Sequence, residues 1–291
     1  MKNSFIYILL TAILFTTLEP VSKLIAADVS PLSMTFIRFL IGGAILLPFA
    51  VRKMKKNSIQ LSGKDYGILA GLGVLCICFS MVLLQFAVLT ADSPALIAII
   101  FSSNSVFTII LATFVLKEKM TAKKLIAMVL CIAGVLVCAD FSSGTNGLSV
   151  LYAVASAITF SLYTVLSKKY SAKVSGIIQT GFSFFFGSLV LLVILLIMRE
   201  NVFAGLTSAK NIGIMLYLGI AITGVGYWSF FRAMEKSSAT AASTVFFIKP
   251  ILTPFATFFI NGIVPAPKVF IALVLVVAGS VLTALPSKAK E

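Results

Sequence analysis

The fold of this chain is decided by a stretch that occurs twice. Residues 93–134 read SPALIAIIFSSNSVFTIILATFVLKEKMTAKKLIAMVLCIAG, and residues 238–279 read SATAASTVFFIKPILTPFATFFINGIVPAPKVFIALVLVVAG. A constant offset of 145 aligns the two stretches without a gap and places, for example, Phe101 on Phe246. The same offset relates earlier parts of the chain to the second half. We therefore predict two structural repeats.

The composition places the chain in a lipid bilayer. Its residues are 60% hydrophobic and 11% charged, with a mean hydropathy of +1.12, whereas soluble domains are about 45–50% apolar and about 25% charged. Because a membrane crossing takes roughly twenty residues, 291 residues hold about ten helices and no separate soluble domain. We predict an all-α membrane protein with two five-helix repeats, residues 1–143 and 144–291.

Ten apolar segments are separated by short polar or Pro-containing breaks. We expect spans at 4–27, 31–51, 65–90, 93–116, 122–140, 147–167, 176–199, 210–234, 238–261 and 267–285. Within the third span, Gly67 and Gly71 have the Gly-x-x-x-Gly spacing that is typical of close helix packing. Each predicted repeat therefore crosses the membrane five times.

Lysine and arginine residues predict the orientation of these spans. They collect in loops that the span order places on one side, above all in 52–64 and 117–124. The positive-inside rule assigns this side and both termini to the cytoplasm, and we expect a multi-pass protein of the plasma membrane. The net charge of +14 follows from this bias, so no nucleic acid is expected as a partner. An odd number of spans inverts the second repeat relative to the first, which is typical of alternating-access transporters with a central cavity.

Charged side chains inside the spans are the first candidates for a functional site, because a charge at the bilayer centre costs at least ~2.5–3.5 kcal/mol. Glu19 is the only carboxylate well inside a span, and Pro20 after it predicts a kink. Lys23 is placed one turn further along, where it could pair with Glu19 or extend to the outer interface. Arg38 is predicted either to clamp loop carbonyls or Glu19, or to contact a substrate.

Lys249 is the most informative cation, because it precedes Pro250 in the middle of the ninth span. We expect it to meet an anionic group of a substrate without needing a partner in the protein. Its counterpart in the first repeat is Asn104, which is also polar. The remaining candidates for the cavity wall, with interface anchoring as the alternative for the aromatic ones, are Gln85, Tyr163, Tyr227 and Trp228.

Metal, cofactor and enzyme chemistry are not expected. The chain has no histidine and four cysteines, and the cysteines lack companions for a metal site. An intramembrane enzyme would need a nucleophile or an acid and base at one depth, and Glu19 has no such companion. Without histidine, Glu19 is the candidate at membrane depth for coupling protons, or else for holding the amine of a substrate.

Several motifs resemble one transporter family. Pro31-Leu-Ser-Met-Thr-Phe-Ile-Arg38-Phe-Leu resembles the second-helix motif of the EamA-type drug/metabolite transporters. Ser93 to Gly134, with its Leu116-Lys-Glu118 segment, resembles the fourth and fifth helices of that family, and Ser237 to Gly279 resembles a second copy. The resemblance covers essentially the whole chain. It implies ten helices in two repeats and secondary transport of small metabolites, often export, without ATP.

Two further details bear on the substrate. Glu19-Pro20-x-x-Lys23 resembles a subgroup of transporters for carboxylates, amino acids and amines, whereas Asn261-Gly262-Ile263 replaces the Leu-Gly-Glu that is common in the second copy. We predict a secondary-active exporter of small polar metabolites such as amino acids or related zwitterions. The alternative is a carrier of phosphorylated or lipid-like anionic metabolites. The expected partners are the substrate, the lipid bilayer and, as a candidate coupling ion, protons; a monomer and a homodimer both stay open.

Overall fold

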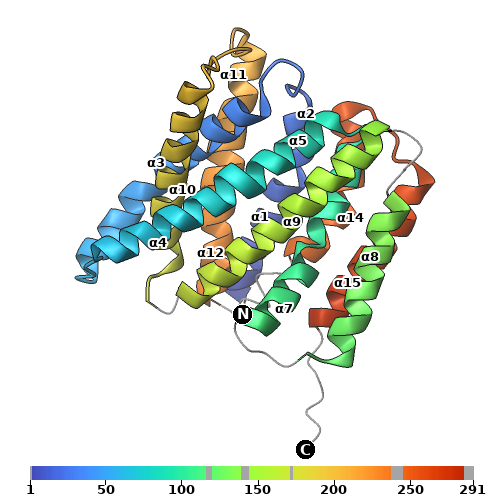
Figure 1. Ribbon diagram of the computed structural model, residues 1–291, viewed down its shortest axis with the longest axis horizontal. Helices are drawn as coiled ribbons and strands as arrows, with labels where there is room; N and C mark the ends of the chain where they lie inside the picture. Colours follow the sequence, from blue (N-terminus) through green and yellow to red (C-terminus); the bar gives the residue numbers. More distant parts are fainter. Residues whose placement is uncertain (1, 116–119, 139–143, 171–172, 237–244, 285–291) are drawn as a thin grey trace, which may run out of the picture.

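The described part of the chain is built from helices (Figure 1). The computed structural model describes residues 2–115, 120–138, 144–170, 173–236 and 245–284. The elements in these ranges are α1 (Lys2–Thr16), α2 (Leu18–Lys23), α3 (Pro31–Lys56), α4 (Gly63–Val74), the π-helix η1 (Leu75–Met81), α5 (Val82–Thr90), α6 (Pro94–Ser102), α7 (Asn104–Val115), α8 (Ala122–Cys138), α9 (Gly144–Tyr170), α10 (Gly176–Ile197), α11 (Ala209–Leu216), the π-helix η2 (Tyr217–Gly226), α12 (Tyr227–Lys236), α14 (Val245–Asn261) and α15 (Pro267–Ala284). Seven helical stretches within them are long and apolar enough to cross a membrane, and two shorter apolar stretches accompany them. The prediction of an all-α membrane protein with about ten helices is confirmed.

The predicted spans contain breaks that hydropathy alone does not mark. The first span divides into α1 and α2 at Thr17, and the fourth into α6 and α7 at Ser103. The expected kink at Pro20 is displaced, because Pro20 lies in the first turn of α2, where its missing N–H costs no helical hydrogen bond. The π-helices η1 and η2 interrupt the third and eighth spans at positions related by the offset of the repeat.

Polar caps define where two of the long spans begin. Ser30 caps α3 by accepting a hydrogen bond from the backbone N–H of Ser33, and Pro31 occupies the first turn. Ser62 and Asp65 form a reciprocal capping box at the start of α4. Such caps satisfy the N–H groups that a helix start leaves free. The capping box of Ser62 and Asp65 marks where the basic segment between α3 and α4 ends and the third span begins.

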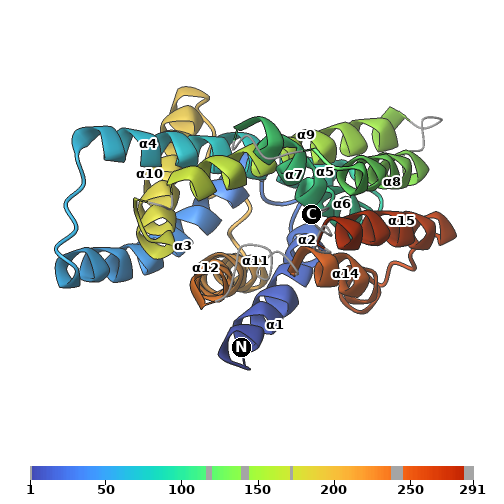
Figure 2. The ribbon, with the colours of Figure 1, turned by 90° about the horizontal axis from the view of Figure 1, so that it is seen from below.

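Helices at corresponding places in the two halves make corresponding contacts. α3 packs against α10, and α8 against α15. α1 contacts α12 and α14, while α9, its counterpart in the second half, contacts α5 and α7. Figure 2 shows α3, α4 and α10 on one side of the molecule and α8, α14 and α15 on the other, with α1 and α12 between them. The two halves are therefore interlocked, and one apolar core extends through both.

A pair of glycines sets the closest approach between two of these helices. A Cβ atom added to Gly73 of α4 would lie 2.0 Å from the carbonyl oxygen of Ser183, and one added to Gly187 of α10 would lie 2.6 Å from the backbone of Gly73. Any side chain at either position would force the helices apart. The close packing expected at Gly67 and Gly71 is wrong, because nothing lies within 4 Å of a Cβ at either glycine.

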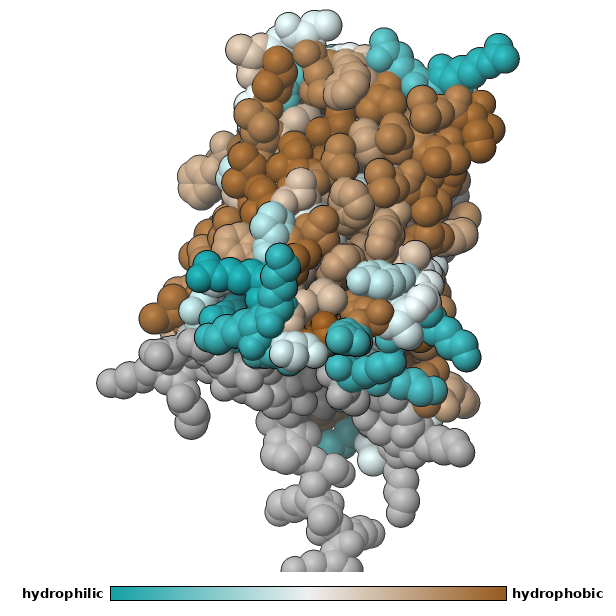
Figure 3. Space-filling view, turned by 90° about the vertical axis from the view of Figure 1, so that its left-hand side faces the viewer, coloured by the Kyte–Doolittle hydropathy of each residue, from teal (hydrophilic) through white to brown (hydrophobic). Residues whose placement is uncertain are grey.

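The outer face of the bundle is apolar over a broad band. Figure 3 shows this band with hydrophilic residues gathered toward its upper and lower edges. Large hydrophobic side chains are freely exposed, among them Phe259 at 80% and Ile197 at 76%. Exposure of this kind is unfavourable in water and favourable in contact with acyl chains. The chain is a multi-pass membrane protein.

Candidate functional site

A buried ion pair joins the two halves of the chain. Nζ of Lys249 lies 2.5 Å from Oε1 of Glu19, and the two side chains are 2% and 0% exposed. Glu19 belongs to α2 and Lys249 to α14, 230 residues apart in sequence. Lys249 was expected to need no partner in the protein. That prediction is wrong, because the Glu19 carboxylate compensates its charge.

Local sequence explains why both side chains reach this place. Glu19 stands in the first turn of α2, directly after the break at Thr17. Lys249 precedes Pro250, and Pro254 follows one turn later within α14. Each proline removes a backbone donor and leaves a carbonyl without its helical partner. The pair therefore lies between two stretches of helix with incomplete backbone hydrogen bonding, as is common where membrane helices line a polar site.

The ion pair leaves hydrogen-bonding capacity unused. Oε2 of Glu19 has no hydrogen-bond partner among the residues that the structure describes. Nζ of Lys249 also lies 5.1 Å from the centroid of the Phe101 ring, a cation–π contact. Phe101 in turn packs on Phe160, and Phe160 on Phe246, with centroids 5.3 and 6.1 Å apart. One carboxylate oxygen is thus available to a ligand beside an aromatic wall.

Arg38 contributes a second buried cation near the pair. Its side chain is fully buried, and within the described ranges none of its three guanidinium nitrogens has a hydrogen-bond partner. Its guanidinium carbon lies 4.6 Å from the centroid of the Phe39 ring. Glu19 and Tyr227 are close enough to interact with it electrostatically. The clamp to loop carbonyls or to Glu19 is not formed, so Arg38 presents unused donors toward the same region.

Lys23 extends away from Glu19 to the end of α5. Its Nζ donates hydrogen bonds to the carbonyl oxygens of Val88, Leu89 and Ala91 at 3.1, 3.0 and 2.7 Å. These carbonyls end α5, where a cation also interacts favourably with the helix dipole. Of the two alternatives for Lys23, pairing with Glu19 is wrong, because the Lys23 ammonium is bound by backbone oxygens and Glu19 pairs with Lys249. Lys23 anchors α2 to α5.

Two polar contacts that the sequence did not indicate also hold α2. Nδ2 of Asn261, at the end of α14, donates to the carbonyl oxygen of Pro20 at 3.0 Å. Nε2 of Gln85 in α5 donates to the hydroxyl of Ser22 at 3.4 Å. Asn261 was recognisable only as a departure from a family motif, and Ser22 carried no signal of its own. The short helix that presents Glu19 is therefore held by side chains of α14 and α5.

Of the two predicted tyrosines, Tyr227 lies within electrostatic range of Arg38 and Glu19, and Tyr163 packs on the aromatic side chains beside the pair. Tyr227 is buried among Phe15, Phe39 and Phe184, with ring centroids 4.9 to 6.2 Å apart. Tyr163 is buried beside Phe160, at 5.8 Å between centroids. Cys76 in η1 lies near Arg38, Tyr163 and Tyr227, although the sequence placed it only as a packing residue. π-helical segments often occur at functional positions.

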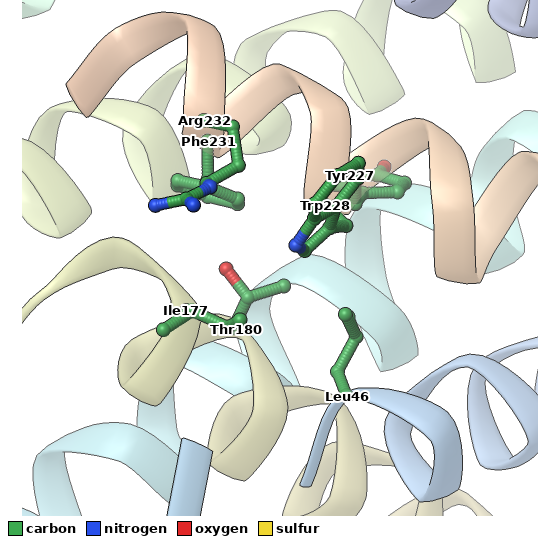
Figure 4. A pocket seen from close by; sticks show the side chains of 7 residues that line it. All are labelled: Leu46, Ile177, Thr180, Tyr227, Trp228, Phe231 and Arg232. Carbon is green, nitrogen blue, oxygen red and sulfur yellow. The ribbon is translucent and has the colours of Figure 1, made fainter. Parts of the chain in front are cut away.

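Asn104 and Trp228 do not join this group. The amide of Asn104 donates to the carbonyl oxygen of Phe101 at 2.8 Å, which satisfies it locally at the break between α6 and α7. Trp228 packs edge-on against Tyr7, with centroids 5.5 Å apart. It also lines a cavity of only about 10 Å³. Figure 4 shows Trp228 on one helix with Tyr227, Phe231 and Arg232, facing Leu46, Ile177 and Thr180.

Comparison with known proteins identifies the family. The sequence profile of the EamA-like transporter family matches residues 2–139 and, again, residues 147–285. The chain belongs to the EamA-like transporter family. The resemblance seen in the sequence motifs is confirmed, and the fold described above is that of a family of membrane transporters.

Individual relatives support this membership over nearly the full length. An uncharacterized transporter of Clostridium kluyveri is 38% identical over 97% of this chain and 93% of its own. An S-adenosylmethionine uptake transporter of Rickettsia conorii is 23% identical over 93% of this chain and 88% of its own. A protein of known crystal structure superposes with a TM-score of 0.65 at 16% identity, covering 97% and 96% of the two chains. That last likeness concerns the fold alone.

In this EamA-like transporter, the buried charges do not cancel. Glu19 supplies one negative charge, and Lys249 and Arg38 supply two positive ones. Arg38 has unused donors and Glu19 has an unused oxygen in the described structure, and the two side chains are within electrostatic range of each other. A ligand that offers both an anionic and a cationic group matches this arrangement.

Proposed function

We propose that this protein is a secondary transporter of small polar metabolites that carry an ammonium and a carboxylate, as amino acids do. The buried pair of Glu19 and Lys249 is the observation that supports it. Each member can exchange its protein partner for a substrate group of the same charge: the ammonium replaces Lys249 on Glu19, and the carboxylate binds Lys249 and Arg38. The exchange conserves the number of ion contacts, so a polar substrate enters a buried site without leaving a charge unpaired.

The position of the pair links this exchange to movement. Glu19 and Lys249 come from different halves of the chain, and opening the pair removes a contact between α2 and α14. A ligand that binds one arrangement of the two halves more tightly shifts their equilibrium. Alternating access by movement of one half against the other is the mechanism we propose. The Rickettsia relatives are named for S-adenosylmethionine, a molecule with an amino acid group, which agrees with this class of substrate.

The direct test is substrate exchange in liposomes that contain the purified full-length protein. A panel of labelled amino acids, amines, organic acids and phosphomonoesters is offered at equal concentrations. We expect exchange of one or more zwitterions, and little exchange of amines that lack a carboxylate. Transport only of cations would contradict the proposal, because Lys249 and Arg38 would then have no anion to bind.

One observation favours a second class of substrate. The buried site has an excess of one positive charge, and within the described residues the Arg38 guanidinium has no hydrogen-bond partner. A carrier of phosphorylated or lipid-like anionic metabolites would use that excess. In the same panel, exchange of phosphomonoesters in preference to zwitterions would select this alternative.

Proton coupling is the alternative to binding of the substrate's ammonium by Glu19. In that case a proton takes the place of Lys249 on the empty carboxylate, binding from one side of the membrane and leaving to the other. Glu19→Gln should then abolish transport driven by a pH gradient and retain exchange at equal pH. Loss of both activities would instead make Glu19 a fixed ligand for the amine. Transport measured out of the liposomes and into them decides between export, which we propose, and uptake.

We also propose that the protein lies in the plasma membrane with both termini in the cytoplasm. The basic segment between α3 and α4 supports this orientation, and Figure 1 draws the start of α1 and the end of α15 toward the same edge of the molecule. Single cysteines can be introduced at Lys53 and at Asp28 in a background without native cysteines. An impermeant maleimide should label only the Asp28 position in intact cells, and labelling at Lys53 would reverse the orientation.

A further inference from the structure

A groove on the outside of the bundle lies away from the proposed substrate site. Its volume is about 690 Å³. It is lined by residues of α3 together with one aromatic side chain of α10, namely Ala44, Leu47, Pro48, Val51, Arg52, Lys55 and Phe185. Most of the lining is apolar, and the two charged residues belong to the last turns of α3.

The packing of α3 on α10 explains the shape of the groove. The helices are antiparallel and closest at glycines, because Gly43 meets the backbone of Phe184 and Phe185, and Gly181 meets Leu46 and Ala50. Small or ring-shaped side chains on the outer side of α3, Ala44 and Pro48, leave space beside Phe185. Both are exposed, so the groove opens to whatever surrounds the transporter.

The length of the groove fits half a bilayer. From Ala44 to Lys55, α3 rises by about 16 Å at 1.5 Å per residue. The hydrocarbon core of one leaflet is about 15 Å thick, half of roughly 30 Å. An acyl chain lying along Leu47 and Val51 therefore places its head group at the level of Arg52 and Lys55.

The two cations in the last turns of α3 favour anionic lipids. Arg52 and Lys55 are exposed and three residues apart, so they share one face of α3. Within the described part of the chain, no acidic side chain pairs with either of them. Two neighbouring cations beside an apolar groove at the membrane surface attract a phosphate group and repel a cationic head group.

We infer that this groove is a binding site for an anionic phospholipid, with an acyl chain along α3 and Phe185 and the phosphate on Arg52 and Lys55. The site lies on the helix that also carries Arg38, so the lipid buttresses α3 against α10. It does not depend on the identity of the transported substrate.

Native mass spectrometry of the delipidated full-length protein tests the site. Phosphatidylglycerol and phosphatidylcholine with the same acyl chains are added separately. We expect phosphatidylglycerol to bind more tightly, and the double substitution Arg52→Gln with Lys55→Gln to weaken it on the order of 30-fold. The matched control is Arg199→Gln with Lys210→Gln, two exposed cations at the opposite end of the α3 and α10 pair, which should leave binding unchanged.

Two further arms test the groove and the source of the phosphate. Ala44→Phe fills the exposed groove and should weaken binding of both lipids, with unchanged elution in size-exclusion chromatography as the control for folding. Soluble glycerol 3-phosphate should not displace the lipid at equal concentration. Equal retention of both lipids by the wild type, wild-type retention of phosphatidylglycerol by the Arg52 and Lys55 double variant, or displacement by glycerol 3-phosphate would each overturn the inference.

Discussion

The pair of Asp65 and Lys173, called here the rim pair, and the buried pair of Glu19 and Lys249 both connect the first half of the chain to the second. They differ in how many of their hydrogen-bonding groups are used. In the rim pair, Asp65 accepts hydrogen bonds from Lys173 at 2.6 Å and from Tyr170 at 2.8 Å. Its other oxygen accepts from the backbone N–H and the hydroxyl of Ser62 at 2.8 and 2.7 Å. The Lys173 side chain is 60% exposed. The Asp65 side chain is 3% exposed, so the rim pair reaches water through Lys173 only, and both oxygens of its carboxylate are used.

The buried pair of Glu19 and Lys249 has the opposite properties. Both side chains are excluded from solvent, a single hydrogen bond joins them, and Oε2 of Glu19 stays unused in the described structure. Desolvation of two charges makes such a pair a poor source of stability compared with apolar packing. The difference indicates that the rim pair fastens the fold, whereas the buried pair is kept for binding. Four predictions test this contrast.

The largest effect is expected from breaking the buried pair on one side only. Lys249→Met leaves the Glu19 carboxylate buried without a partner, which should cost about 3–5 kcal/mol of stability. The double substitution Glu19→Gln with Lys249→Met should restore most of it, because no charge is stranded. Thermal unfolding in detergent measures both, and transport should be absent in both. A single variant as stable as the double variant would contradict the pairing.

Arg38 extends the comparison to a buried cation that has no hydrogen-bond partner in the described structure. Its removal therefore leaves no paired charge behind. Arg38→Met should abolish transport while the melting temperature stays at or above the wild-type value. Arg38→Lys should recover partial activity at most, since a compact ammonium does not reproduce the planar guanidinium fork. Transport assays and thermal unfolding on the same preparations separate the two effects. A large loss of stability in Arg38→Met would assign Arg38 a structural role.

Lys23 should show an intermediate effect, because it binds backbone oxygens rather than a carboxylate. Lys23→Met removes the ammonium that donates to the carbonyl oxygens at the end of α5, and it should lower the free energy of unfolding by about 2 kcal/mol. Freed from α5, α2 should present Glu19 less well, so KM should rise more than the maximal rate falls. Lys210→Met, at an exposed cation in α11, is the control. Unchanged stability of Lys23→Met would exclude the anchoring role.

The rim pair should give the smallest effect. Lys173→Met removes an exposed partner from Asp65, whose other hydrogen bonds stay in place, and should cost less than about 1 kcal/mol. The difference from the wild type should shrink further at high salt. Transport should be unchanged in liposomes. Loss of transport in this variant would place the rim pair in the transport cycle and remove the contrast between the two pairs.

Much of the candidate site could be predicted from the sequence. A charged residue inside an apolar span is costly wherever the helix packs, so such a residue stands out as a candidate without knowledge of the fold. Glu19, Arg38 and Lys249 were recognisable as polar residues inside apolar spans, and the structure brings all three together. Tyr163 and Tyr227 also lie in this region. Asn104 and Trp228 could not be sorted from them, since depth along a helix does not tell which way a side chain points.

The sequence by itself determined the membrane class and the approximate spans, and it predicted the relation between the halves. The class and the spans follow from the hydropathy of residues that are neighbours in the chain. The relation between the halves follows from one constant offset in residue number. Only the tertiary structure decided the partners. Glu19 meets Lys249 across 230 residues, and Lys23 meets the end of α5. The repeat offset predicts equal depth for Lys249 and Asn104, and for Glu19 and Thr164. The two residues of each of these repeat-related pairs differ in charge. Because pairing depends on how helices are rotated and packed against one another, the asymmetric charged site emerges only when the two similar halves interlock.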